Sequence, residues 1–119
     1  MSDQFGDHWL RCAKYIEPAL DGSYAIEDVE HEIREGRAKL WPLERSAVVT
    51  QVCEYPQHRA VRVWLAGGEL DEIRRYLPAL DNYARSVGCS RVEVVARKGW
   101  AKVLTGFDAN RIVYTKELG

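Results

Sequence analysis

The arrangement that most constrains the fold is a predicted strand, helix and strand in the second half of the chain. Residues 59–66 alternate between apolar and polar side chains, as a β-strand does. After Gly67-Gly68, apolar residues recur at spacings of three and four, which predicts a helix that ends at Gly88. Residues 91–96 form the second predicted strand. Because the helix crosses between them, the two strands should run parallel or nearly so.

Two amphipathic helices are predicted at the start of the chain. Apolar residues recur at three- and four-residue intervals over residues 7–20, and Pro18 stands where it can stop that helix early. A second stripe follows the capping segment at residues 23–25 and ends at Gly36. These helices should pack their apolar faces against a sheet.

Three strands are predicted between these helices and the crossover helix. They cover residues 38–43, 47–54 and 59–66. The segment at residues 55–58 predicts a turn, and His58 at its tip is interpreted as a solvated turn residue. After the strand at residues 91–96, a short helix from 100 to about 104 and a last strand at 111–116 complete the predicted order.

Composition limits the classes of protein to which the chain can belong. A length of 119 residues with 46% apolar residues supports one domain, residues 1–119. The net charge of −1 gives no electrostatic reason to expect nucleic acid or an anionic membrane as partner. Residues 1–90 carry a net charge of −4 and residues 91–119 a net charge of +3, so the C-terminal part either steers an anion or has an ordinary mixed surface.

Cysteine usage and the N-terminal sequence indicate where the protein works. The three cysteines are widely spaced and form no Cys-x-x-Cys motif, which argues against a disulfide framework or a zinc site. The first residues lack a basic and apolar signal sequence, and no apolar run reaches membrane-spanning length. We therefore expect a soluble protein of a reducing compartment, with no metal.

The order of elements resembles the GNAT acyltransferase fold over residues 7–118. The resemblance rests on the two N-terminal helices, the meander, Ala84-Arg85-Ser86-Val87-Gly88-Cys89 before a strand, and Gly106-Phe107 before the last strand. It implies an α/β (α+β) fold with a central mixed, mostly antiparallel sheet, a crossover helix and a C-terminal strand. The small size, Leu40-Trp41-Pro42 and Gly99-Trp100 look most like the small GNAT-like proteins of tailed bacteriophages and prophages.

The resemblance also implies where an acyl-CoA, such as acetyl-CoA, would bind. Its pantetheine arm would lie between the strands at 59–66 and 91–96, and its pyrophosphate on the loop that follows the first of them. The cofactor-binding residues implied are Val63, Leu65, Gly67, Gly68, Arg97 and Trp100. The loop is nevertheless short, and carboxylates at residues 69, 71 and 72 would repel a phosphate. Gly67 and Gly68 therefore form either a tight turn or a phosphate cradle.

The catalytic residues are harder to assign. GNAT enzymes commonly use a carboxylate to deprotonate an amine and a tyrosine, on the short helix near residue 100, to protonate the thiolate. That helix contains no Tyr, Ser or Cys in this chain, and Lys102 is interpreted as solvated. Glu54 is the candidate base and Tyr114 the candidate proton donor, each with an alternative interpretation as an edge or rim residue.

Three functions follow from the resemblance. The first is an acyl-CoA-dependent N-acyltransferase with a degenerate pyrophosphate loop and an amine acceptor. The second is a non-enzymatic phage virion or assembly protein that binds phage structural proteins or associates with itself. The third is a regulatory binder with an exposed aromatic patch. The expected location is the cytoplasm of the host cell or, for the second function, the virion.

Overall fold

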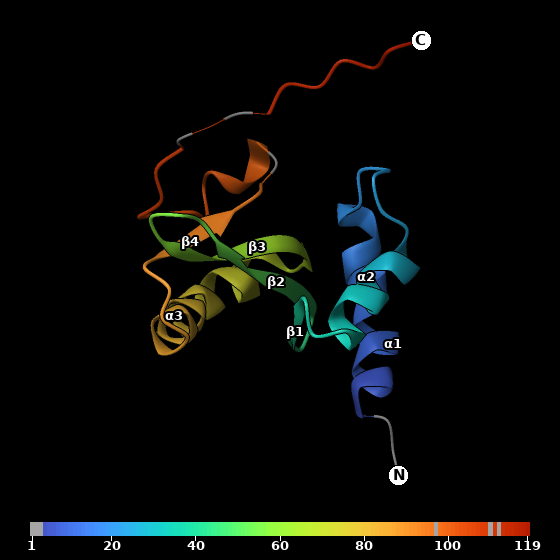
Figure 1. Ribbon diagram of the computed structural model, residues 1–119. Helices are drawn as coiled ribbons and strands as arrows, with labels where there is room; N and C mark the ends of the chain where they lie inside the picture. The colour runs from blue at the N-terminus through green and yellow to red at the C-terminus, as the bar shows by residue number, and fades with distance from the viewer. Residues whose placement is uncertain (1–3, 97, 110, 112) are drawn as a thin grey trace.

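The structure is a computed structural model that describes residues 4–96, 98–109, 111 and 113–119. Its helices are α1 (Gln4–Ile16), α2 (Ile26–Arg34) and α3 (Leu70–Ser86), with 3₁₀ turns at Glu17–Ala19 and Lys98–Trp100. Its strands are β1 (Lys39–Pro42), β2 (Ser46–Glu54), β3 (Arg59–Gly68) and β4 (Arg91–Val94). In Figure 1, α1 and α2 lie together on one side of the sheet and α3 lies on the other. None of the helices described is long and apolar enough to cross a membrane.

The sheet has the order β1-β2-β3-β4 among the described residues. The first three strands are antiparallel neighbours, and β4 pairs with β3 in parallel. The mixed, mostly antiparallel sheet predicted from the sequence is therefore confirmed. The parallel pair follows from α3, which returns the chain to the end of the sheet at which β3 began.

A β-bulge in β3 decides which helix each half of the strand faces. Thr50 on β2 pairs with Val63 and the adjacent Val49 pairs with Leu65, so Trp64 is an extra residue on β3. Side chains alternate along a strand, and an extra residue reverses the alternation. Val63 consequently packs beneath α3, whereas Leu65 packs in the cluster beneath α1 and α2.

The crossover helix α3 forms as its apolar spacing predicts. It buries Ile73, Leu80 and Ala84 against the sheet. A proline inside a helix can kink or interrupt it, but α3 continues through Pro78 as one helix. Gly88 follows with φ of 77°, and the Cys89 N–H donates to the Ala84 carbonyl at 2.8 Å, an ending that favours glycine.

The C-terminal prediction needs correction. The short helix expected near residue 100 is a 3₁₀ turn at Lys98–Trp100, and the described residues from 111 onward form no strand. Figure 1 shows this last segment running away from the sheet. Val113 and Tyr114 are both 88% exposed. β-branched residues raise strand propensity, but a strand also needs a neighbour and an apolar surface to cover, and this segment has neither in the part of the chain described.

Candidate functional site

A cleft opens where β3 and β4 stop pairing. Their ladder ends at Val63 and Val94, and one further bond runs from the Val95 N–H to the Val63 carbonyl at 3.2 Å. Beyond this point the bulge at Trp64 increases the local twist of β3 and turns it away from β4. A cavity of about 220 Å³ lies between the separating ends. The residues lining it are Ala19, Leu20, Asp21, Tyr24, Val63, Trp64, Leu65, Ala66, Val94, Val95, Ala96 and Trp100.

The loop between α1 and α2 forms the polar side of this cleft. Tyr24 meets the Trp64 ring edge to face, with centroids 5.0 Å apart. Asp21 accepts a hydrogen bond from the Ser23 N–H at 2.9 Å, and this bond holds the pKa of Asp21 below its usual value. Among the described residues that line the cleft, Asp21 is the one carboxylate and Tyr24 the one hydroxyl. The cleft thus combines apolar walls with one anionic and one phenolic group.

Three residues predicted for cofactor binding lie on the wall of this cleft. Val63 and Leu65 are buried there, and half-buried Trp100 contributes from the turn after β4. They come together because β3 and β4 are adjacent and parallel, so the ends of both strands meet at the same edge of the sheet. A fourth candidate, Arg97, lies outside the described residues.

The two glycines predicted at the phosphate loop have a structural role instead. Both are strand residues, since Gly67 pairs with Ala47 and Gly68 with Ser46. A Cβ added to Gly67 would overlap the carbonyl oxygen of Tyr15. At Gly68, φ is 110° and an added Cβ would lie 2.5 Å from the Arg45 carbonyl oxygen. Glycine is needed here because the backbone approaches other backbone closely.

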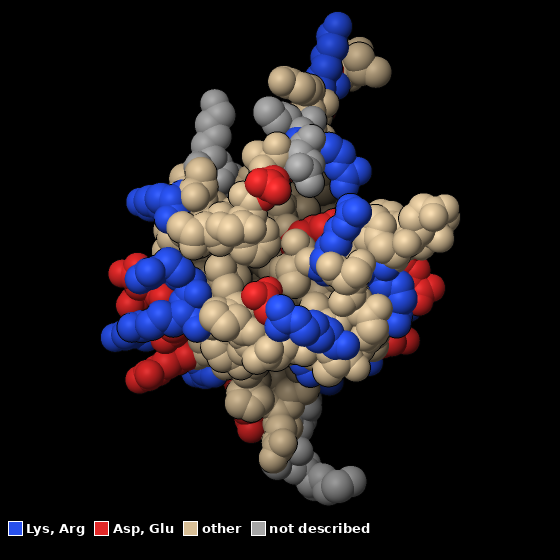
Figure 2. Space-filling view, turned by 90° about the vertical axis from the view of Figure 1, so that its left-hand side faces the viewer, with Lys and Arg blue, Asp and Glu red and all other residues tan. Residues whose placement is uncertain are grey.

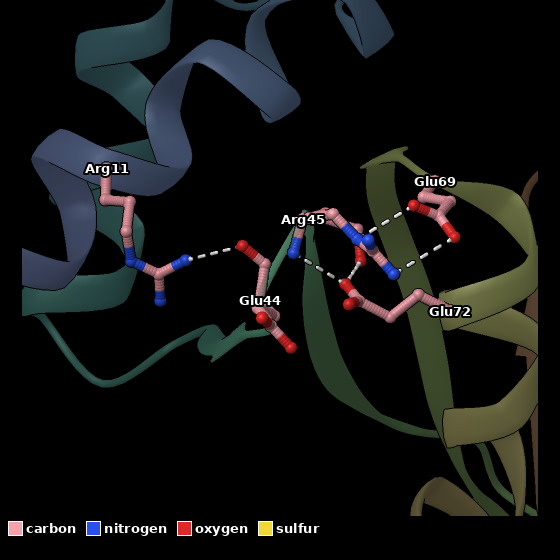
Figure 3. Close-up of polar contacts among 6 residues, drawn as sticks. Arg11, Glu44, Arg45, Glu69 and Glu72 are labelled. Atoms are coloured by element: carbon pink, nitrogen blue, oxygen red, sulfur yellow. Dashed lines mark hydrogen bonds and ion pairs between the residues drawn. The ribbon is translucent and has the colours of Figure 1, made fainter.

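Polar contacts close the start of α3, as Figure 3 shows. The Arg45 guanidinium pairs with the Glu69 carboxylate, Nε to Oε2, at 2.9 Å. The Arg45 N–H donates to Glu72 Oε1 at 2.9 Å, and the Ser46 hydroxyl donates to the same oxygen. The hydrogen bond from Ser46 lowers the pKa of Glu72 below its usual value. We call Arg45, Ser46, Glu69 and Glu72 the Arg45 corner.

The turn between β1 and β2, which carries Arg45, is also tied to α1. The Arg11 guanidinium donates to the carbonyl oxygen of Leu43 at 2.6 Å. It also lies 3.5 Å from the carbonyl oxygen of Glu44, as Figure 3 shows. A charged donor to a backbone carbonyl is among the stronger hydrogen bonds of a protein. The turn between β1 and β2 is thus held on one side by α1 and, through the Arg45 corner, on the other by α3.

The two residues predicted for catalysis lie away from the cleft. Glu54 ends β2 and pairs with Arg59 at 3.2 Å, at the start of β3, whereas the cleft lies at the far end of that strand. Tyr114 is exposed on the C-terminal segment. These positions give the two catalytic assignments no support and agree with the alternative interpretation of both as edge or rim residues.

Sequence reasoning missed Asp21 and Tyr24. They belong to a polar connection between two helices, which hydrophobic periodicity treats only as a boundary. The one local signal was the length of that connection, because a loop placed beside a scaffold often carries binding residues. Their distance from Trp64 in the sequence hid the contact that brings them to the cleft.

The surface near α3 is mixed in charge. Figure 2 views the side that is at the left in Figure 1, and Lys and Arg side chains there stand beside Asp and Glu side chains. A second hollow of about 540 Å³ lies between α1 and α2, lined by Asp7, Glu27 and Glu30 among others, and it is separate from the cleft.

Known structures share this arrangement of helices and strands. A GNAT family acetyltransferase from Staphylococcus aureus aligns with a TM-score of 0.64 over 99% of this chain and 95% of its own, at 10% identity. The chain has the GNAT fold. Glucosamine-6-phosphate N-acetyltransferase from Arabidopsis thaliana aligns over 100% of this chain and 95% of its own, with a TM-score of 0.63 and 10% identity.

A third GNAT-like structure and two sequence comparisons complete the picture. An acetyltransferase from Trypanosoma brucei aligns over 99% of this chain and 96% of its own, with a TM-score of 0.61 and 9% identity. Comparison with protein-family models and with curated proteins finds no match. The likeness therefore lies in the fold, and the function has to be argued from the site.

Proposed function

We propose that the protein is an N-acyltransferase that takes an acyl group from an acyl-CoA thioester and transfers it to an amine. The observation that carries this proposal is the cleft between the separated ends of β3 and β4, with Asp21 and Tyr24 at its side. The names of the similar structures, which include acetyltransferases from three organisms, support the same class of reaction.

The walls of the cleft suit the pantetheine arm of such a thioester. The arm alternates short hydrocarbon segments with two amides. Half-buried Trp64 and Trp100 and the exposed Val95 offer apolar surface to the hydrocarbon segments. Beyond the Val63–Val94 pair the two strands no longer form a ladder with each other, so their backbone N–H and C=O groups can bond the amides, as strands bond an added peptide. The thioester would then lie near the loop between α1 and α2.

In the proposed reaction, each of the two polar side chains at the cleft takes part in one proton transfer. The amine nitrogen attacks the thioester carbonyl carbon, the new C–N bond forms and the C–S bond breaks. Asp21 receives the proton that the amine loses, and the Tyr24 hydroxyl donates a proton to the leaving thiolate. A carboxylate is ionised at neutral pH, so Asp21 can accept a hydrogen bond from the amine before transfer; its lowered pKa makes it a weaker base than an ordinary aspartate.

Calorimetric titration with acetyl-CoA, together with a light-scattering mass, tests the proposal. We expect micromolar binding and release of thiol from acetyl-CoA when primary amines are added. Asp21→Asn should lower kcat/KM by roughly 10²- to 10⁴-fold and change acetyl-CoA affinity by less than about twofold. Glu54→Gln, a carboxylate far from the cleft, is the matched control and should keep full activity. Absence of binding by folded protein would rule out the enzyme.

A second candidate is an assembly role, with the GNAT scaffold kept and its chemistry lost. Three exposed apolar residues of the C-terminal segment, Val113, Tyr114 and Leu118, favour it, because exposed apolar side chains gathered in one segment often mark contact sites. This role predicts no heat with acetyl-CoA and a mass well above 13.6 kDa.

A further inference from the structure

We infer that the cleft recognises its donor through the pantetheine arm, and that the nucleotide half of a CoA thioester has no binding site among the described residues. The inference rests on the proposed function and narrows it to a class of donor. It concerns the turn from β3 to α3, where the GNAT resemblance would place a pyrophosphate. Backbone, space and charge at that turn all disagree with a phosphate.

Part of the backbone at this turn is already engaged. A phosphate at a helix N-terminus is held by N–H groups that lack partners within the helix. Here the Glu69 N–H, which would be the first of them, donates to the Arg45 carbonyl at 3.1 Å. Gly67 and Gly68 are paired with β2 as strand residues. The strand therefore continues to the start of α3 and leaves no loop to wrap an anion.

The space beside the two glycines is filled by the protein itself. The Tyr15 carbonyl lies against Gly67, and the backbone and side chain of Ser46 lie against Gly68. A cradle for a phosphate requires an open concavity next to the glycines, and a Cβ added there would collide with the phosphate. In this chain a Cβ would intrude on α1 and on β2 instead.

The charged side chains at the start of α3 form ion pairs with one another. Glu69 precedes the helix as its N-cap residue, and Asp71 and Glu72 occupy the first turn, where carboxylates complement the partial positive charge of the helix. The guanidinium of Arg45 is paired with Glu69, and that of Arg74 lies 3.6 Å from Asp71. A phosphate would have to displace these carboxylates from their cations, and it would bring two like-charged groups together.

The size of the cleft agrees with binding of the pantetheine arm alone. Its volume of about 220 Å³ is below the range of roughly 300–1,000 Å³ typical of pockets that enclose a whole drug-sized ligand. The arm of the thioester fits a cleft of this kind, and the nucleotide would extend into solvent. A donor that carries the arm without the nucleotide should therefore bind as well as acyl-CoA does.

Calorimetric titration of the full chain with acetyl-CoA and with S-acetylpantetheine tests this inference. We expect dissociation constants within about threefold of each other, and little change between low and high salt, because no phosphate contact is made. Acetyl-CoA binding more than tenfold tighter, with a strong loss in high salt, would overturn the inference and leave the proposed function standing. Failure of both ligands to bind would overturn the proposed function, and the inference with it.

Arg97 provides the sharpest variant, because it is the one cation among the cofactor-binding residues that the resemblance implies. Arg97→Ala should leave the ratio of the two dissociation constants unchanged, as should Lys116→Ala, a matched loss of charge on the C-terminal segment. A selective fivefold or greater loss of acetyl-CoA affinity in Arg97→Ala alone would show that Arg97 binds the phosphates, and would overturn the inference that the donor is recognised through its pantetheine arm.

Discussion

Substitution of Gly68 by alanine tests whether this glycine serves the fold. The added Cβ would lie 2.5 Å from the Arg45 carbonyl oxygen, whereas a carbon and an oxygen normally approach to about 3.3 Å. The backbone would therefore have to move by about 0.8 Å at a position paired with Ser46 in the sheet. The residue also holds φ of 110°, which an alanine adopts with strain.

The expected loss of unfolding free energy in Gly68→Ala has two parts. A left-handed φ costs a residue with a Cβ about 1–2 kcal/mol. Forcing an extra carbon into a filled site costs about 1–3 kcal/mol. Together they give about 3 kcal/mol, which would lower the melting temperature by about 12 °C in a domain of this size. Since domains are commonly stable by about 5–15 kcal/mol, the variant should still fold.

Gly36→Ala is the matched control, because Gly36 also has positive φ, of 80°, but nothing lies within 4 Å of an added Cβ. It should lose only the strain, about 1–2 kcal/mol. Thermal unfolding followed by circular dichroism, with urea unfolding at 25 °C, measures both variants. If Gly68→Ala loses no more stability than Gly36→Ala, the close approach of β3 to the Arg45 carbonyl is refuted.

Two further predictions concern the Arg45 corner and the face under α3. The lowered pKa of Glu72 means that its charge stabilises the fold above its ordinary pKa of 4.5, and that this stability is lost as pH falls through the lowered pKa. The difference in urea midpoint between wild type and Glu72→Gln should therefore shrink from pH 5 to pH 3, and a constant difference would contradict this. Trp41→Phe removes the donor that bonds the buried Thr50 hydroxyl at 2.8 Å, and should cost about 1–3 kcal/mol in urea unfolding. The double variant Trp41→Phe with Thr50→Val should lose less unfolding free energy than the sum of the two single variants. An additive loss would count against the hydrogen bond.

The sequence predicted most of the secondary structure because the signals are local. The spacing of Leu70, Ile73 and Leu80 marks the buried face of α3 whatever that face packs against. Gly88 could end the helix because its left-handed φ is a property of one residue. The order of strands and the crossover then followed from the few topologies that such elements allow.

The predicted last strand failed for the converse reason. Residues 111–116 have strand propensity, but propensity describes how a residue fits a sheet that is already present. Nothing local states whether a neighbouring strand will be available. In the part of the chain described, the segment instead runs free of the sheet, and Tyr114 goes with it.

The sequence by itself determined most of the elements, their order up to β4 and the apolar residues Val63 and Leu65 that line the cleft. Only the tertiary structure decided that Asp21 reaches this cleft and that Gly68 lies against Arg45. Hydrophobic period and turn chemistry depend on neighbours within a few residues, whereas a cleft depends on where strands separate and on which distant loop covers the gap. The bulge at Trp64 links the two levels, since one extra residue turns β3 away from β4 and opens the site.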